Sequence, residues 1–193
     1  MAADLSRALD PAMWFVHAGI QADPWQEAAI RSTSKRQLWL VHRQGGKSTT
    51  AGLKALAKAT QEPGSLSLLL SPSQRQSAEL LRKVVELRAV ISGAPEPIAE
   101  AAHRLEFPNG GRVLSLPSSE ATVRGYSKVS LLVLDEAARI PDDIVAAVRP
   151  MLAVSNGEIV CLSTPWVFSR GVGAWRQLGT HDRNRRAMRA DIR

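Results

Sequence analysis

A short apolar run followed by a glycine-containing turn and a helical pattern constrains the fold of this 193-residue chain more than any other feature. Residues 38–42 (LWLVH) read as a buried strand, and residues 43–48 (RQGGKS) lead into a segment with helical spacing. The turn matches the closing end of the phosphate-loop pattern G-x-x-x-x-G-K-[ST], but Val41 stands where the first glycine belongs. A strand, a turn and a helix are the context that this pattern needs, so the sequence predicts a phosphate loop without its first glycine.

The residues of this turn have the chemistry that a nucleotide phosphate requires. Successive backbone N–H groups and the start of a helix bind the β-phosphate, a lysine neutralises charge, and a hydroxyl holds Mg²⁺. Lys47 is therefore predicted to bind the phosphates of ATP, Ser48 to bind phosphate and metal, and Arg43 to act in catalysis. The other predicted nucleotide contacts of the loop are Gln44, Gly45, Gly46 and Thr49. A chance Gly-Lys-Ser sequence is the alternative.

Two adjacent acids end another apolar run. Residues 131–134 (LLVL) read as a buried strand, and Asp135 and Glu136 follow it directly. Carboxylates are rarely placed at the tip of a buried strand without a cation or a hydrogen-bonding partner. This is the arrangement of a Walker B strand, so Asp135 is predicted to support the metal and Glu136 to polarise the water that attacks the γ-phosphate.

The remaining apolar runs indicate the fold class. Short apolar runs alternate with longer segments of helical spacing, as in a mainly parallel α/β sheet flanked by helices. Strands are expected at residues 38–42, 66–71, 131–135 and 158–163. Helices are expected after the phosphate loop, after Ser73, which can act as a cap, and at residues 141–152. Alternating side chains on both sides of Asn109-Gly110-Gly111 predict an added antiparallel hairpin.

Composition indicates the size of the core and the class of partner. A chain of 193 residues with 45% hydrophobic content supports about one domain. Lys and Arg number 25 against 18 Asp and Glu, and the net charge of +7 favours a polyanionic partner such as nucleic acid over a merely soluble basic surface. The single cysteine, Cys161, is expected to be a buried, reduced thiol of an intracellular protein. No apolar run approaches the roughly 20 residues of a bilayer span, so no membrane role is expected.

Three weaker signals each allow a functional and a structural interpretation. Ser163 and Thr164, followed by Pro165, either sense the γ-phosphate or form an ordinary turn after a strand. Arg124 either reaches the transferring phosphate or is a surface arginine, and spacing alone favours the surface. Trp25 and Gln26 either stack on adenine and bind its edge, or lie in the first turn of a helix that Asp23 caps.

The order of these motifs resembles the large terminase subunits of tailed bacteriophages, the motors that package viral DNA. The resemblance covers most of the chain and rests on DPWQ, HRQGGKS, SPSQRQSAELLRKV, TVRGYSKVSLLVLDEAARIPDD, VRPML and LSTPWVFSRGVGAW. Members of that family often start this loop without glycine and read Arg-Gln-x-Gly-Lys-Ser or Thr, as residues 43–48 do. A loop without the first glycine is therefore what the resemblance leads one to expect.

The resemblance also implies a fold, cofactors and partners. The fold is a RecA-like P-loop ATPase core of the additional-strand, catalytic-glutamate class, and the cofactors are ATP and Mg²⁺. Residues 163–165 match the family's coupling motif, Gln26 its adenine-side glutamine, and Arg124 an arginine finger donated to a neighbouring subunit. The implied partners are double-stranded DNA, a small terminase subunit and a homo-oligomeric ring on a portal, in the cytoplasm of the infected bacterial host.

One P-loop ATPase domain is expected over residues 1–193. It would contain an N-terminal helical segment with the adenine-side motif (1–36), a core (37–180) and a basic tail or linker (181–193). Arginines of the tail could grip DNA, although a solvated basic end is favoured. The acidic metal ligands of the family's ribonuclease H-type nuclease domain are absent from this sequence, so ATP hydrolysis without DNA cleavage is expected.

Two other functions stay open from the sequence. A helicase-like ATPase of superfamily 2 shares the upstream glutamine, the phosphate loop and the Asp-Glu pair, but it needs a second RecA-like domain. A nucleotide-gated module would instead use ATP to assemble on DNA or on a packaging protein, with little hydrolysis. Strand unwinding would favour the first, and ATP binding without phosphate release the second.

Overall fold

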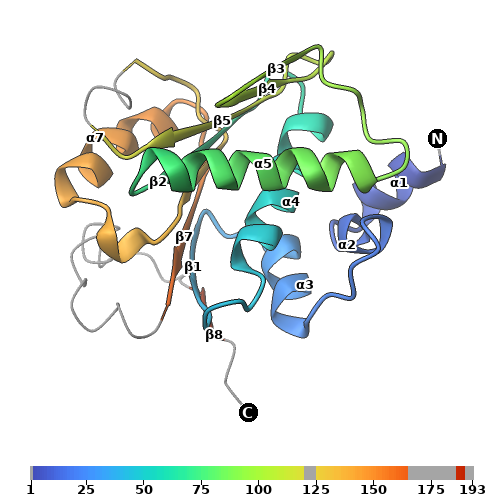
Figure 1. Cartoon of the computed structure of the whole chain (residues 1–193), viewed down its shortest axis with the longest axis horizontal. Coiled ribbons are helices and arrows are strands. Elements are labelled where there is room, and N and C mark those ends of the chain that lie inside the picture. Colours follow the sequence, from blue (N-terminus) through green and yellow to red (C-terminus); the bar gives the residue numbers. More distant parts are fainter. Residues whose placement is uncertain (1, 120–124, 165–185, 190–193) are drawn as a thin grey trace.

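The strands of this computed structural model form one sheet in the order β3-β4-β5-β2-β6-β7-β1-β8 (Figure 1). The structure describes residues 2–119, 125–164 and 186–189. From β5 to β8 all neighbouring strands are parallel, whereas β3, β4 and β5 pair antiparallel. The strands are β1 (Arg36–Leu40), β2 (Leu66–Ser71), β3 (Ala99–Ala101), β4 (Arg104–Glu106), β5 (Arg112–Pro117), β6 (Leu131–Leu134), β7 (Glu158–Ser163) and β8 (Arg186–Arg189).

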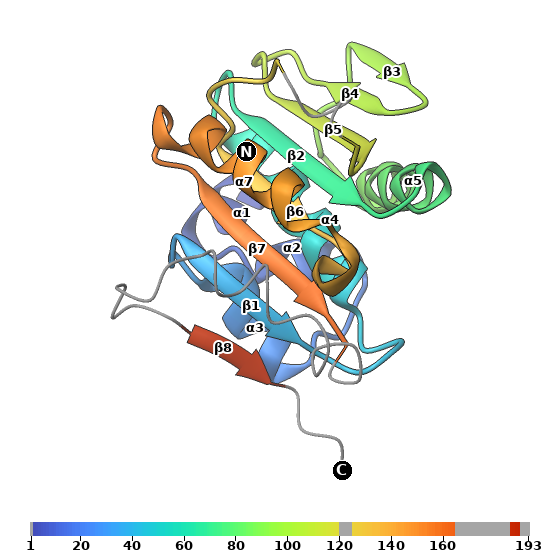
Figure 2. The same ribbon diagram turned by 90° about the vertical axis from the view of Figure 1, so that its left-hand side faces the viewer.

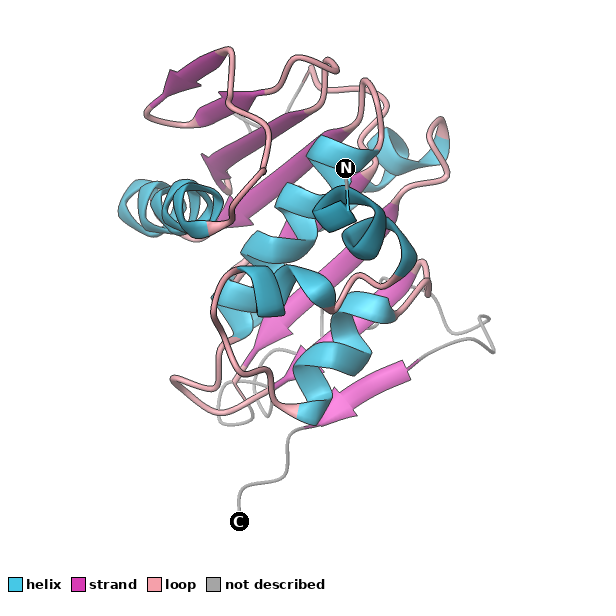
Figure 3. Cartoon of the chain, turned by 90° about the vertical axis from the view of Figure 1, so that its right-hand side faces the viewer, coloured by secondary structure: helices cyan, strands magenta, loops and turns pink. Residues whose placement is uncertain are grey.

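Helices cover both faces of this sheet. The helices of the first half of the chain lie on one face (Figure 3), and α7 lies on the other (Figure 2). The helical elements are α1 (Ala2–Leu9), α2 (Met13–His17), α3 (Pro24–Arg31), α4 (Lys47–Gln61), α5 (Gln74–Val90), the 3₁₀ turn η1 (Ala137–Arg139) and α7 (Asp142–Ala153). The predicted mainly parallel α/β sheet flanked by helices is thus confirmed.

Alternating residues of the strands supply two separate cores. On β1, Trp39 packs in the cluster that contains α4 and α5, whereas Leu38 and Leu40 pack with α7. Successive side chains of a strand point to opposite faces, so a strand buried on both faces is apolar throughout. The central strands β2, β6 and β7 are buried at every position; β6 is wholly apolar, whereas β2 includes Ser67 and Ser71 and β7 includes Glu158 and Ser163. Cys161, on β7, is buried as predicted.

The predicted hairpin is present, but it has a further strand. β4 and β5 pair antiparallel around the predicted turn, and β5 is also the parallel neighbour of β2. The turn is attached to α4, since the Asn109 side chain donates hydrogen bonds to the carbonyls of Ala59 (3.0 Å) and Thr60 (2.9 Å). Gly111 is required there, because a Cβ would lie 1.8 Å from the Ala59 carbonyl oxygen. The short strand β3 has no counterpart in the sequence-based prediction.

Other element boundaries in the structure lie close to those predicted from the sequence. β2 and β7 have the predicted bounds, whereas β1 begins two residues earlier than predicted. Ser73 caps α5 by accepting a hydrogen bond from the Gln76 N–H at 3.3 Å.

One segment differs from the prediction. Residues Arg186–Arg189 lie within the range predicted to be a tail or linker, but they form the strand β8 beside β1. Among the described residues, no helix combines the length and the apolar character that crossing a bilayer requires.

Candidate active site

The glycine-containing turn joins β1 to α4 through two left-handed residues. Gly46, with φ 76°, is the N-cap of α4, and Gln44 has φ 63°. Val41 is fully buried, and a Cβ on Gly45 would lie only 2.5 Å from its Cγ1 atom. The residue at the missing-glycine position is therefore a core residue. Close approaches that require glycine occur at Gly45, and also at Gly46, where a Cβ would lie 2.5 Å from Gln26 Nε2.

We expect Gly45→Ala to weaken ATP binding roughly tenfold, about 1.4 kcal/mol, because the added methyl displaces the loop from Val41. Titration with a fluorescent ATP analogue measures this change. Gly64→Ala is the matched control, since Gly64 has φ +69° but no atom within 4 Å of the added Cβ. Equal affinities for the wild type and Gly45→Ala would contradict the prediction.

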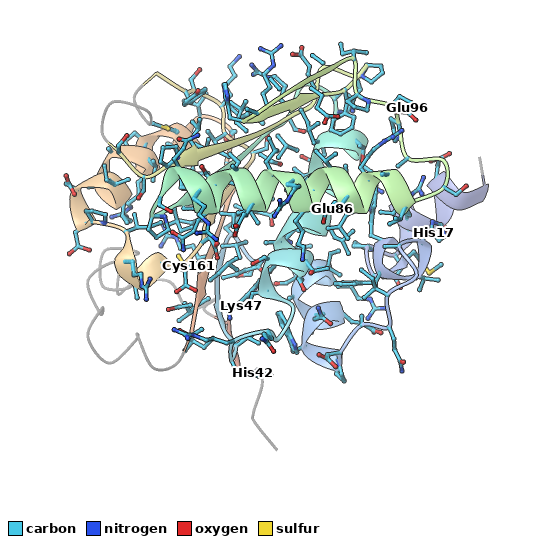
Figure 4. All side chains as sticks on the ribbon, in the orientation of Figure 1. His17, His42, Lys47, Glu86, Glu96 and Cys161 are labelled. Atoms are coloured by element: carbon cyan, nitrogen blue, oxygen red, sulfur yellow. The ribbon has the colours of Figure 1, made fainter. Side chains whose placement is uncertain are left out.

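Lys47 is held at the base of this loop. Its ammonium group donates hydrogen bonds to the carbonyl oxygens of Val41 (2.8 Å) and His42 (2.9 Å), and the side chain is buried. Burial lowers the pKa of Lys47, and the nearby charges of Glu136 and Asp135 oppose that shift. Figure 4 shows Lys47 and His42 on the loop, with Glu86 on the facing helix α5. The lysine thus lies between the loop and the two acids.

The two acids lie where β6 ends. The Asp135 N–H donates to the Leu70 carbonyl of β2 (2.8 Å), which keeps Asp135 in register with the sheet. Burial and then the adjacent charge of Glu136 raise the pKa of Asp135 to about 6. Glu136 is left-handed, with φ 49° and ψ 46°, and its N–H donates to Asp135 Oδ1 (3.1 Å). Such a conformation is uncommon outside glycine and is often found at functional sites.

A cavity of about 610 Å³ joins the loop to the acids. The predicted residues that line it are Arg43, Gln44, Gly45, Gly46, Lys47, Ser48, Thr49, Asp135, Glu136 and Thr164. Parallel strands present their carboxyl ends at one edge of a sheet, so the loop after β1 and the acids after β6 meet there. The structure therefore brings these residues together, and their individual roles stay predictions.

The end of β7 connects the sheet to the phosphate loop. The Ser163 carbonyl accepts a hydrogen bond from the Val41 N–H (3.2 Å), and the parallel register pairs Leu40 with Ser163. Both Ser163 and Thr164 are buried, and Thr164 reaches the cavity. Thr164 is thus connected to the start of the phosphate loop through one residue, Ser163, and one backbone hydrogen bond.

Gln26 and Trp25 lie beside the loop but do not line the cavity. The Gln26 side chain accepts from the Asp23 N–H (2.8 Å) and donates to Thr50 Oγ1 (3.0 Å), so both ends of the amide are engaged. Trp25 packs edge-on against Trp39, with ring centroids 6.1 Å apart. These contacts match the helix-start alternative, and adenine recognition by Gln26 stays a prediction that requires its amide to change partners.

Two of the predicted features lie outside the described residues. These are Arg124, the expected arginine finger, and Pro165 of the coupling motif. The sequence-based prediction also missed the polar wall opposite the loop, which is formed by Arg139 and by Gln76, Glu79, Arg82, Lys83 and Glu86 of α5. The α5 residues recur every three or four positions, so a polar stripe opposite the apolar one was the available signal.

Comparisons with known proteins agree with this arrangement. No family model matches the chain. It is 28% identical over 174 residues to the large terminase subunit of Thermus virus P23-45, covering 78% of this chain and 36% of that protein. The chain thus spans about a third of the length of this curated relative.

Solved structures share the fold. The large terminase ATPase domain of Thermus phage P74-26 superposes with a TM-score of 0.70 and 24% identity, over 91% of this chain and 83% of that chain. A DEAD box protein of Methanococcus jannaschii superposes with a TM-score of 0.59 and 12% identity, over 87% of this chain and 49% of that chain. The chain therefore has the fold of a phage terminase ATPase domain and resembles large terminase subunits in sequence, as its motifs indicated.

Proposed function

We propose that the chain is the Mg²⁺-dependent ATPase of a phage DNA-packaging motor, which couples ATP hydrolysis to movement of double-stranded DNA. The observation that carries this proposal is the shared cavity in which the acids after β6 face the phosphate loop. The sequence match to a large terminase subunit supports packaging over unwinding, because helicase domains share the fold but match less well.

The chain's own residues supply the steps of hydrolysis. The N–H groups at the start of α4 and the Lys47 ammonium bind the β- and γ-phosphates. Glu136 orients the attacking water and accepts its proton, and Arg43, at the rim of the cavity, offsets the charge on the transferring phosphate. Thr164 responds to loss of the γ-phosphate and passes the change to Val41 through Ser163.

The two acids fit a divalent cation. Neither Asp135 nor Glu136 makes an ion pair within the part of the chain that the structure describes, although both line the cavity. Two adjacent carboxylates that form no ion pair with any described residue, with the Lys47 ammonium nearby but bound to loop carbonyls, favour a bound metal ion. Asp135 and Ser48 would hold Mg²⁺, which would supply positive charge that offsets the charge of the nucleotide phosphates.

Assembly is part of the proposal. The chain would act in a homo-oligomeric ring on a portal, with a small terminase subunit, in the cytoplasm of the host. Arg124 would reach the transferring phosphate, either in its own subunit or in a neighbouring subunit. If a neighbour receives it, each subunit alone would hydrolyse ATP slowly.

Phosphate release measured against protein concentration tests this proposal. We expect magnesium-dependent turnover that rises more than linearly with concentration and increases with double-stranded DNA. Omitting Mg²⁺ and adding chelator, and separately using Glu136→Gln, give the inactive controls. ATP binding with phosphate release no greater than that of Glu136→Gln at every concentration would instead support the nucleotide-gated binding module.

A further inference from the structure

A second cavity lies at the opposite end of the sheet from the phosphate loop. It has a volume of about 490 Å³, and its lining comes from the amino ends of β1 and β7 and the last turns of α7. Figure 2 shows α7 lying over this side of the sheet. β1 has five residues, so the two sites are separated by about 17 Å along this strand at roughly 3.3 Å per residue. This cavity is therefore distinct from the candidate active site.

The charged side chains that line this second cavity are all basic. They are Lys35, Arg36 and Arg149, and no described carboxylate lines the cavity. Lys35 and Arg149 are exposed, and neither makes an ion pair with another described residue. Glu158 begins the adjacent strand, but its carboxylate contacts Lys54 and Lys58 of α4, on the other face of the sheet. The cavity thus has a local excess of positive charge.

The remaining lining is largely apolar. Pro150, Leu152 and Ile159 contribute to it, together with small residues of α7. A sugar–phosphate backbone has the matching chemistry, since anionic phosphates alternate with deoxyribose rings whose carbon faces are apolar. Cations at the rim would contact phosphates while a sugar packs on the floor. The lining contains no aromatic ring, so base stacking, which single strands favour, is not offered.

We propose that this cavity binds the phosphate backbone of double-stranded DNA through Lys35 and Arg149. The proposal rests on DNA being the partner in the proposed function, and it names residues that contact that DNA. Because these contacts reach phosphates, they would be independent of base sequence, as a translocating motor requires. Nucleotide hydrolysis and this contact with DNA would then take place at opposite ends of the same strand.

Fluorescence anisotropy with a labelled 30-base-pair duplex tests the proposal across a salt titration. The double variant Lys35→Gln/Arg149→Gln should bind about tenfold more weakly near 0.1 M salt, and the slope of log K against log salt should fall by about 1.8. The control Arg75→Gln/Lys128→Gln removes the same charge from two exposed sites elsewhere and should change affinity less than twofold. Melting temperatures equal to that of the wild type show that the variants are folded.

Each outcome decides between the possibilities. If the test and control variants lose the same amount of duplex affinity, DNA binding depends on overall charge and not on this cavity. That result would overturn the proposal, while the proposed function would stand. Poly-glutamate that competes with equal potency would assign the cavity to an acidic polypeptide, and a second molecule of labelled ADP bound per chain would assign it to a free nucleotide. Absence of duplex binding by the wild type at low salt would remove both this proposal and the packaging function.

Discussion

Replacing Glu136 by glutamine should lower kcat for ATP hydrolysis by about 10²- to 10⁴-fold, which is the usual contribution of a positioned general base. The amide cannot accept the proton of the attacking water, although it has nearly the same shape. Because Glu136 follows β6 and is not part of the loop that holds the phosphates, although its charge acts on Lys47, the dissociation constant for ATP should change less than about threefold. Phosphate release at saturating ATP and titration with a fluorescent analogue measure the two quantities.

Glutamine has nearly the shape of glutamate, so we expect residue 136 to keep its left-handed backbone and a fall in kcat to report the loss of the carboxylate. Glu100→Gln is the matched control, since Glu100 is an exposed carboxylate on the short edge strand β3. A Glu136→Gln protein that keeps more than half of the wild-type kcat would refute the assignment of Glu136 as the base. Weaker ATP binding with an unchanged kcat would show that Glu136 stabilises the bound ATP and not the transition state of hydrolysis.

The second large effect is expected at Glu158, the buried first residue of β7. Its carboxylate lies 3.3 Å from the Lys54 ammonium and 2.9 Å from the Lys58 ammonium, and both lysines belong to α4. Glu158→Ala leaves two poorly solvated cations without this partner, which should cost about 3–5 kcal/mol of the free energy of unfolding. For a chain of this size the melting temperature should fall by about 10 °C.

Glu62→Ala is the control for this substitution. Glu62 also pairs with Lys58, but its side chain is 54% exposed, so its loss should cost only about 0.2–1 kcal/mol. Thermal unfolding followed by circular dichroism compares the two variants. Equal destabilisation by both would show that the buried position of Glu158 has no special contribution.

The same cluster predicts how stability depends on pH. Burial alone would raise the pKa of Glu158, but the charges and hydrogen bonds of Lys54 and Lys58 outweigh burial and hold this pKa below its usual value of 4.5. A carboxyl group whose pKa is lower in the folded state stabilises the protein above the unfolded pKa, and this contribution is lost as pH falls through the folded pKa. The difference in melting temperature between wild type and Glu158→Ala should therefore shrink below about pH 4.5.

Much of the site could be predicted because its parts are local in sequence. A strand, a turn with Gly45 and Gly46, and a helix are contiguous, and so are an apolar strand and the pair Asp135 and Glu136. Parallel pairing then places both at one edge of the sheet, which is a general property of α/β folds. The strand β3, the hydrogen bond from Gln26 to Thr50 and the polar wall of α5 were not accessible in this way. Each depends on which segments meet in space, and the local pattern is equally compatible with a solvated surface.

The sequence by itself determined the elements that bind phosphate, because backbone conformation and hydrophobic periodicity act over a few residues. It also identified Val41 as the departure from the usual loop. Only the tertiary structure decided what that departure means: Val41 is packed in the core, and Gly45, which lies against it, has no room for a side chain. It likewise decided that Lys35 and Arg149, 114 positions apart, border one basic cavity. Contacts over such separations follow from strand order and helix packing, which no local pattern contains.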